Sequence, residues 1–144
     1  MKQKGFTLVE LLLVIAAMAL VSTLSISFYS RFLLQNSVAN TVDQFVGQLR
    51  KAQLYAMMGK QNNGWGINFS GSTITLFQGE TFATRVAAFD EKFNVPSTVS
   101  VTGFTEIDYA QRTGLPSASS TITISGGGNT KTITVNTEGV VNRN

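Results

Sequence analysis

The feature that most constrains this chain is an apolar stretch close to its start. After Lys2 and Lys4, residues 5–30 contain a single charged side chain, that of Glu10. Roughly 20 apolar residues, each rising about 1.5 Å in a helix, cover the hydrocarbon core of a bilayer. The stretch therefore predicts a single membrane-spanning helix, which we assign to residues 6–30. Because both basic residues precede it, we expect the N-terminus in the cytoplasm and the rest of the chain across the membrane.

Glu10 is the anomaly in this stretch. A charged group at the bilayer centre costs on the order of 3 kcal/mol on insertion scales, so a compensating partner is expected. About one helical turn precedes Glu10, so its carboxylate lies near the helix N-terminus, where the macrodipole favours negative charge.

Two interpretations follow from the pattern alone. A cleaved secretory signal would use Lys2 and Lys4 as its basic region and Ala17-Met18-Ala19 as a cleavage site of small residues. Against it, Glu10 interrupts the apolar run, and the run continues past Ala19. A plain membrane anchor is the second interpretation, and it leaves Glu10 and the Gly5-Phe6 junction unexplained.

A third interpretation comes from the junction itself. The sequence Gly-Phe-Thr-Leu-Val-Glu-Leu-Leu at residues 5–12 resembles the class III signal of type IV prepilins and pseudopilins. The resemblance implies a leader of residues 1–5, cleavage between Gly5 and Phe6 by a membrane-embedded prepilin peptidase, and N-methylation of the new Phe6 amine. It also implies a precursor in the inner (cytoplasmic) membrane that later enters a filament.

The physical chemistry of Glu10 agrees with this resemblance. Cleavage would place a positive amine at Phe6, on a helix stretch with no other cation. When helices of neighbouring subunits pack with a stagger, that amine can pair with Glu10 of the next subunit. Such a pair is worth much more in a low dielectric than at a surface, and an unpaired charge there is costly. We therefore predict Phe6 and Glu10 as the subunit assembly residues.

The helix is expected to continue beyond the membrane. Residues 28–58 contain no proline, and apolar side chains recur there every three to four residues, which is typical of an amphipathic helix. Gly59 is the expected stop. We assign residues 31–59 to this amphipathic continuation. Its apolar stripe comprises Phe28, Phe32, Ala39, Val42, Phe45, Leu49, Ala52 and Ala56.

The remaining residues, 60–144, predict an antiparallel β domain. Residues 65–69 and 73–77 flank Ser70-Gly71-Ser72 and predict a hairpin, and residues 121–124 and 132–135 bracket a glycine-rich turn and predict another. Further strands are expected at residues 85–89, 99–101, 105–109 and 140–141. The predicted fold class is α+β and pilin-like: a long N-terminal helix, membrane-spanning in its first half and amphipathic in its second, packed on an antiparallel β-sheet.

The composition excludes several kinds of chemistry. The chain has no cysteine and no histidine, so it lacks thiolate ligands and the commonest general base. We interpret the carboxylate pairs Asp90-Glu91 and Glu106/Asp108 as solvated charges rather than metal ligands, and Trp65 and Phe69 as core residues rather than ligand-binding ones. The prediction is a protein that is not an enzyme, with no catalytic, cofactor-binding or metal-binding residue.

The charge balance also argues against nucleic acid as a partner. Removing Lys2 and Lys4 from the 11 basic residues leaves 9 against 8 acidic ones, a net charge of +1. From Lys60 onward six basic and six acidic residues cancel. A nucleic-acid-binding surface usually carries clustered lysine and arginine.

A finer resemblance lies at the end of the predicted helix. Residues 49–56, Leu-Arg-Lys-Ala-Gln-Leu-Tyr-Ala, and the closing residues 133–140 are similar to the minor pseudopilin H / FimT-like group. Gln53 stands where that group usually has a second arginine.

The predicted function is a structural subunit, a minor pseudopilin or pilin, of a type II secretion pseudopilus or a type IV pilus-like filament. The resemblance implies as partners other pilin or pseudopilin subunits, the prepilin peptidase, an inner-membrane assembly platform with its cytoplasmic ATPase, and membrane lipid before assembly. The alternative that stays open is a DNA-binding minor pilin for DNA uptake.

Overall fold

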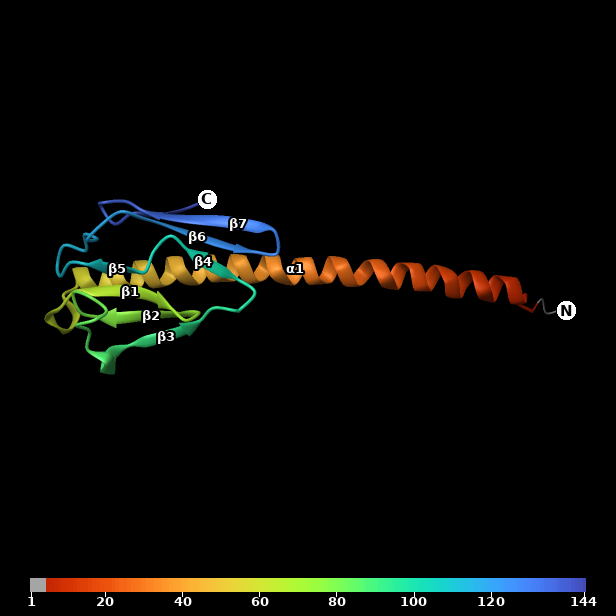
Figure 1. Cartoon of the computed structure of the whole chain (residues 1–144), viewed down its shortest axis with the longest axis horizontal. Coiled ribbons are helices and arrows are strands. Elements are labelled where there is room, and N and C mark those ends of the chain that lie inside the picture. Colours follow the sequence, from red (N-terminus) through yellow and green to blue (C-terminus); the bar gives the residue numbers. More distant parts are fainter. Residues whose placement is uncertain (1–4) are drawn as a thin grey trace. The chain divides into compact units, whose positions relative to one another are not determined.

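The computed structural model describes residues 5–144, apart from the side chains of residues 24–28. Lys2 and Lys4, on which the predicted leader and orientation depend, lie outside the described residues. The chain divides into two compact units between Leu33 and Leu34. Helix α1 (Leu8–Met57) contributes to both units, and all of the strands belong to the second (Figure 1).

From Val38 onward, one face of α1 is buried in the core of the second unit. The predicted apolar stripe is confirmed at Val42, Phe45, Leu49, Ala52 and Ala56, which are all buried. It is wrong at Ala39 and Phe32, which are exposed, and the Phe28 side chain lies outside the described residues. The helix ends at Met57, and Gly59 follows in the left-handed conformation with φ 61°, which confirms it as the stop.

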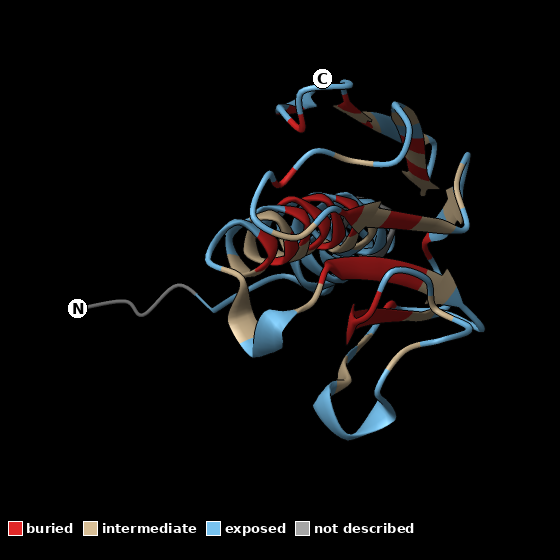
Figure 2. Cartoon of the chain, turned by 90° about the vertical axis from the view of Figure 1, so that its left-hand side faces the viewer, coloured by how far each residue is buried: buried red, intermediate tan, exposed pale blue. Residues whose placement is uncertain are grey.

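Within residues 5–144, eight strands form two antiparallel sheets of four strands each, in the orders β3-β2-β1-β5 and β4-β6-β7-β8. The strands are β1 (Trp65–Ser70), β2 (Thr73–Gln78), β3 (Glu91–Asn94), β4 (Ser100–Thr102), β5 (Glu106–Tyr109), β6 (Ser120–Gly126), β7 (Asn129–Val135) and β8 (Val141–Arg143). Buried residues of both sheets, red in Figure 2, join those of α1 in one apolar core. The predicted α+β, pilin-like fold is confirmed, with two sheets in place of the one that we expected.

Both predicted hairpins are present. Strands β1 and β2 pair from Trp65↔Gln78 to Ser70↔Thr73, which leaves Gly71 and Ser72 as a two-residue turn with φ of 56° and 63°. Strands β6 and β7 close in the same way around Gly127 and Gly128. Positive φ at both central residues gives the turn a twist that matches the strands, which explains the glycines.

The strand predicted at residues 85–89 is wrong. The chain there forms a loop that contains the short 3₁₀ turn η2 (Ala87–Phe89), and the third strand begins only at Glu91. Side-chain contacts close this loop. Arg85 donates from Nε to Asp90 Oδ2 at 3.0 Å and from a terminal nitrogen to the Phe82 carbonyl at 2.8 Å. Phe82 in turn packs edge-on against Phe77 of β2.

The interpretation of Trp65 and Phe69 as core residues is confirmed. Trp65 is 1% exposed and packs edge-on against Tyr55 of α1, with ring centroids 4.9 Å apart. Phe69 packs against Phe45 of α1 at 5.9 Å. Aromatic pairs of this kind are worth about 0.5–1.5 kcal/mol beyond their buried area. They join the first sheet to the helix.

Candidate processing and assembly site

The predicted site residues lie where the chain enters α1. Gly5, Phe6 and Thr7 are non-helical, and the helix begins at Leu8. Thr7 and Glu10 bond to each other across the first turn. Glu10 Oε2 accepts the Thr7 backbone N–H and the Thr7 hydroxyl, both at 2.9 Å, and Thr7 Oγ1 accepts the Glu10 backbone N–H at 3.3 Å. This reciprocal arrangement is a capping box, which satisfies donors that a helix start otherwise leaves unpaired.

The capping box changes how Glu10 is understood. Its carboxylate is held by the neighbouring Thr7, so the first turn of its own helix already compensates part of its charge. Glu10 Oε2 takes both bonds from Thr7, and within residues 5–144 no hydrogen bond reaches Oε1. Sequence reasoning placed Glu10 near the helix dipole but missed Thr7. The Thr-x-x-Glu spacing at positions 7 and 10 was the signal that could have found it.

The predicted cleavage bond lies in exposed, non-helical chain. Phe6 is 89% exposed, and a Cβ added at Gly5 would meet no atom within 4 Å. Nothing in the fold of the described residues therefore requires glycine at position 5. Glu10 bonds to Thr7 and not to Phe6 in this single chain, so the predicted pairing of Phe6 with Glu10 stays a prediction about neighbouring subunits.

The first turns of α1 are apolar and exposed. The exposed large side chains between the helix start and Val21 are Leu8, Val9, Leu11, Leu12, Leu13, Val14, Ile15, Met18, Leu20 and Val21. The Ser22 and Thr23 hydroxyls donate to carbonyls one turn earlier, those of Met18 and Leu20, at 2.8 and 2.9 Å. Apolar side chains in this number are expected to be covered by lipid or protein.

A search of the described residues finds no helix that is both long enough and apolar enough to cross a membrane.

Three ion pairs form among the charged side chains of the second unit. Lys51 bonds Glu91 at 2.6 Å, Arg85 bonds Asp90 at 3.0 Å, and Arg143 bonds Asp43 at 2.6 Å. The hydrogen bond that Lys51 donates to the Glu91 carboxylate raises the pKa of Lys51. Asp90 and Glu91, which we expected to be solvated charges, are therefore both in ion pairs, and the Asp90 side chain is only 5% exposed.

Two further polar groups of the second unit are Asp108 and Tyr109 of β5. Asp108 accepts the Ser117 hydroxyl at 2.7 Å. Burial raises the pKa of Tyr109, whose hydroxyl has no hydrogen-bond partner among the described residues. In that part of the chain no three histidine, cysteine, aspartate or glutamate side chains gather as metal ligands would.

Comparisons with known proteins bear on both the helix start and the fold. The family model described as the prokaryotic N-terminal methylation motif matches residues 1–26. The chain carries the N-methylation motif of type IV pilins and pseudopilins. The match covers the capping box, the exposed Gly5–Phe6 bond and the apolar turns that follow them. The comparison with curated proteins gives no match.

The fold has a counterpart among solved structures. The minor pseudopilin EpsH from the type 2 secretion system of Vibrio cholerae superimposes with a TM-score of 0.58 at 10% sequence identity. The similarity covers 75% of this chain and 96% of that one. At this identity the likeness establishes the pilin-like fold. Pilins and pseudopilins are structural subunits and not enzymes, in agreement with the prediction that this chain is not an enzyme.

Proposed function

We propose that this chain is a structural filament subunit, a minor pseudopilin or pilin, of a type II secretion pseudopilus or a type IV pilus-like filament. The observation that carries the proposal is the N-methylation motif at the start of a helix whose second half is built into a pilin-like domain. The apolar side chains of residues 8–21 are exposed within the described part of their unit, as expected of a segment that packs against lipid or other subunits.

In this proposal the precursor is first inserted in the inner membrane. Residues 6–30 span the bilayer, the N-terminus faces the cytoplasm, and the amphipathic segment 31–59 and the β domain 60–144 lie on the other side. Prepilin peptidase removes residues 1–5 and methylates the Phe6 amine. The exposed, non-helical backbone at Gly5 and Phe6 supports this step, since a peptidase can bind such chain without unwinding a helix.

Assembly then joins subunits through the same helix start. The Phe6 amine of one subunit pairs with Glu10 of its neighbour, while an inner-membrane platform and its ATPase drive the transfer from lipid to filament. The capping box supports this pairing: Thr7 occupies only Oε2 of Glu10, which leaves Oε1 for an incoming ammonium group.

The experiment compares two variants that separate the charge of Glu10 from its capping role. Glu10→Gln removes the charge and retains an oxygen for the bonds from Thr7. Thr7→Ala removes the cap and retains the charge. Both variants, and also Glu10→Ala, should be cleaved and inserted in the membrane. The two Glu10 variants should lose at least about tenfold in filament incorporation, because breaking a buried pair costs about 3–5 kcal/mol. Thr7→Ala should lose much less. Normal incorporation of Glu10→Gln would contradict the pairing.

A further inference from the structure

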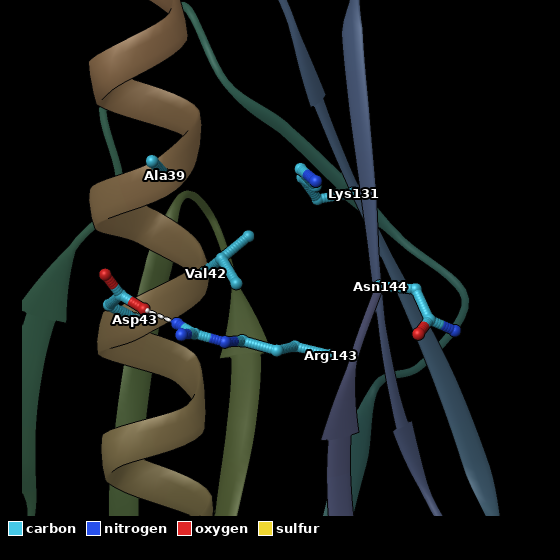
Figure 3. Close-up of a pocket in the computed structure, with 6 residues that line it drawn as sticks. All are labelled: Ala39, Val42, Asp43, Lys131, Arg143 and Asn144. Atoms are coloured by element: carbon cyan, nitrogen blue, oxygen red, sulfur yellow. Dashed lines mark hydrogen bonds and ion pairs between the residues drawn. The ribbon is translucent and has the colours of Figure 1, made fainter.

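Two pockets of the second unit differ in how their charges are balanced. The pocket between α1 and β8, with a volume of about 330 Å³, contains the ion pair between Asp43 and Arg143 (Figure 3). A second pocket, of about 290 Å³, lies where the chain enters β1, and its lining includes Asn63, Glu80 and Asp108. No lysine or arginine lines this second pocket, so its two carboxylates have no cation within it. We call it the acidic pocket.

Asn63 brings a reactive sequence to the acidic pocket. It is the one asparagine of the chain that precedes a glycine. The side-chain amide of an asparagine can be attacked by the backbone nitrogen of the next residue, and glycine leaves that nitrogen accessible because it has no Cβ. Asn129, by comparison, precedes Thr130, whose branched Cβ crowds the nitrogen.

The fold holds the two reacting groups together. The Gly64 backbone N–H donates to Oδ1 of Asn63 at 2.9 Å, so the side-chain amide is folded back over the peptide bond that follows it. Within residues 5–144 the Gly64 nitrogen makes no other hydrogen bond, because the pairing of β1 begins only at Trp65. The nitrogen can therefore react without opening the sheet.

Packing explains the glycine of this pair but not the asparagine. A Cβ at position 64 would lie 2.8 Å from the Tyr109 carbonyl oxygen and 3.3 Å from that of Gly79. The Gly64 carbonyl also accepts the Gly79 backbone N–H at 2.9 Å. The close approach of neighbouring chain thus requires glycine here. The Asn63 side chain, by contrast, bonds to no other element among the described residues, so the fold does not protect it.

We propose that Asn63 is a site of spontaneous deamidation in the folded subunit. The Gly64 nitrogen attacks the side-chain carbon Cγ of Asn63. A bond between the two atoms forms, and the bond from Cγ to Nδ2 breaks as ammonia leaves with the proton of the Gly64 amide. The product is a five-membered succinimide ring. Water then adds to either of its two carbonyl carbons and opens the ring, which leaves aspartate or isoaspartate at this position.

Either product changes the acidic pocket. It adds a third carboxylate to a pocket that already holds those of Glu80 and Asp108, and like charges without a cation repel one another. Isoaspartate also inserts one methylene carbon into the main chain directly before β1, where Trp65 pairs with both Gln78 and Tyr109. Because β1 is an inner strand, the modification should loosen the first sheet, and the unfolding midpoint should fall as the protein ages.

The first test is peptide mapping by mass spectrometry. The folded full-length protein is incubated in detergent at mildly alkaline pH, which favours the deprotonated backbone nitrogen, and is digested after increasing times. Conversion of amide to acid should be at least about tenfold faster at Asn63 than at its exposed neighbour Asn62, which precedes no glycine. Equal rates at the two positions, or conversion of Asn63 only after unfolding in urea, would overturn the proposal.

Three variants form the second test. Asn63→Gln should abolish the conversion and keep the unfolding midpoint constant during incubation, because glutamine must close a larger ring. Asn63→Asp reproduces the charge of the product and should lower the midpoint. Asn62→Asp is the matched control, since it adds the same charge at a residue that does not line the acidic pocket, and it should leave the midpoint unchanged.

An equal midpoint for the two aspartate variants would overturn the role of the acidic pocket, and continued loss of stability in Asn63→Gln would overturn the role of Asn63. None of these measurements requires assembly, so their failure leaves the proposed filament function intact.

Discussion

Two phenylalanines on the same helix show how differently the two units of this protein are built. Phe32, in the first unit, is 58% exposed, and Phe45, in the second, is completely buried. Both belong to α1 and both fit the same apolar periodicity. Phe45 contacts Phe69 and Phe104 in the core, with ring centroids 5.9 and 5.7 Å away.

The difference teaches that periodicity alone does not say what covers an apolar side chain. In the second unit two sheets cover the helix, so its residues determine the stability of the domain. Among the described residues of the first unit no sheet covers the helix, so we expect its side chains to contact lipid, a processing enzyme and neighbouring subunits. Substitutions in the two units should therefore affect different measurements, and the following predictions test that separation.

The largest effect is expected at Gly5. Gly5→Leu should abolish cleavage after position 5, because the peptidase must hold this residue closely. It should leave the unfolding midpoint of the protein unchanged, since a Cβ at position 5 meets no atom within 4 Å. Electrophoresis of membrane fractions with and without the peptidase measures cleavage, and urea unfolding measures stability. If the Gly5→Leu variant were cleaved normally but had a shifted unfolding midpoint, Gly5 would serve the fold and not the cleavage site.

The next effect tests the two phenylalanines directly. Phe45→Ala should lower the free energy of unfolding by about 3–5 kcal/mol, the usual cost of emptying a buried aromatic site. Phe32→Ala is the matched control and should change it by less than about 0.5 kcal/mol, as surface substitutions do. Urea denaturation of the two full-length variants in detergent measures both. A similar decrease in the free energy of unfolding for the two variants would contradict the difference between the two units.

A smaller effect of opposite sign is expected at Gly47. This helical glycine lies on the exposed face of α1, and an added Cβ would meet no atom within 4 Å. Gly47→Ala should therefore stabilise the domain by about 1 kcal/mol. Gly66→Ala is the control with the opposite expectation, because its Cβ would lie 2.7 Å from the Ile107 carbonyl oxygen. A destabilised Gly47→Ala variant would show that this face is not free in the folded subunit.

The smallest effect concerns alkaline pH. Burial raises the pKa of Tyr109, so the folded state favours the neutral phenol. This contribution to stability is fully present below the unfolded pKa of about 10 and is lost as pH rises above it. Tyr109→Phe removes an unpartnered buried hydroxyl, so it should gain up to about 1 kcal/mol near neutral pH and lose less stability at alkaline pH. Tyr29→Phe, at an exposed position, is the control. Unfolding of both variants and of the unaltered protein, followed by circular dichroism from neutral to alkaline pH, measures the effect. An equal response of Tyr29→Phe and Tyr109→Phe would contradict the prediction.

Local chemistry made much of the fold predictable. Gly71 and the pair Gly127-Gly128 predicted hairpins because short turns with positive φ need such residues, and Gly59 predicted the helix end for the same reason. Residues 85–89 looked like a strand, yet the ion pair between Arg85 and Asp90 closes them into a loop. The division into two sheets depends on pairings such as β1 with β5, which join distant segments and leave no local signal.

The candidate site was predicted in part. The residues of the motif were recognisable from Gly5, Phe6 and Glu10, and the capping partner Thr7 was recognisable from its spacing but was missed. The ion pair between Arg143 and Asp43 was beyond prediction, because it joins residues 100 positions apart.

The central claim is that the first unit is a substrate and an assembly element rather than a passive anchor. Mass spectrometry of the protein extracted from membranes that contain an active prepilin peptidase tests it most directly. The account predicts a mature chain that begins at Phe6 with a methylated amine, both in the membrane and in filaments. A chain that still begins at Met1 under these conditions would contradict it.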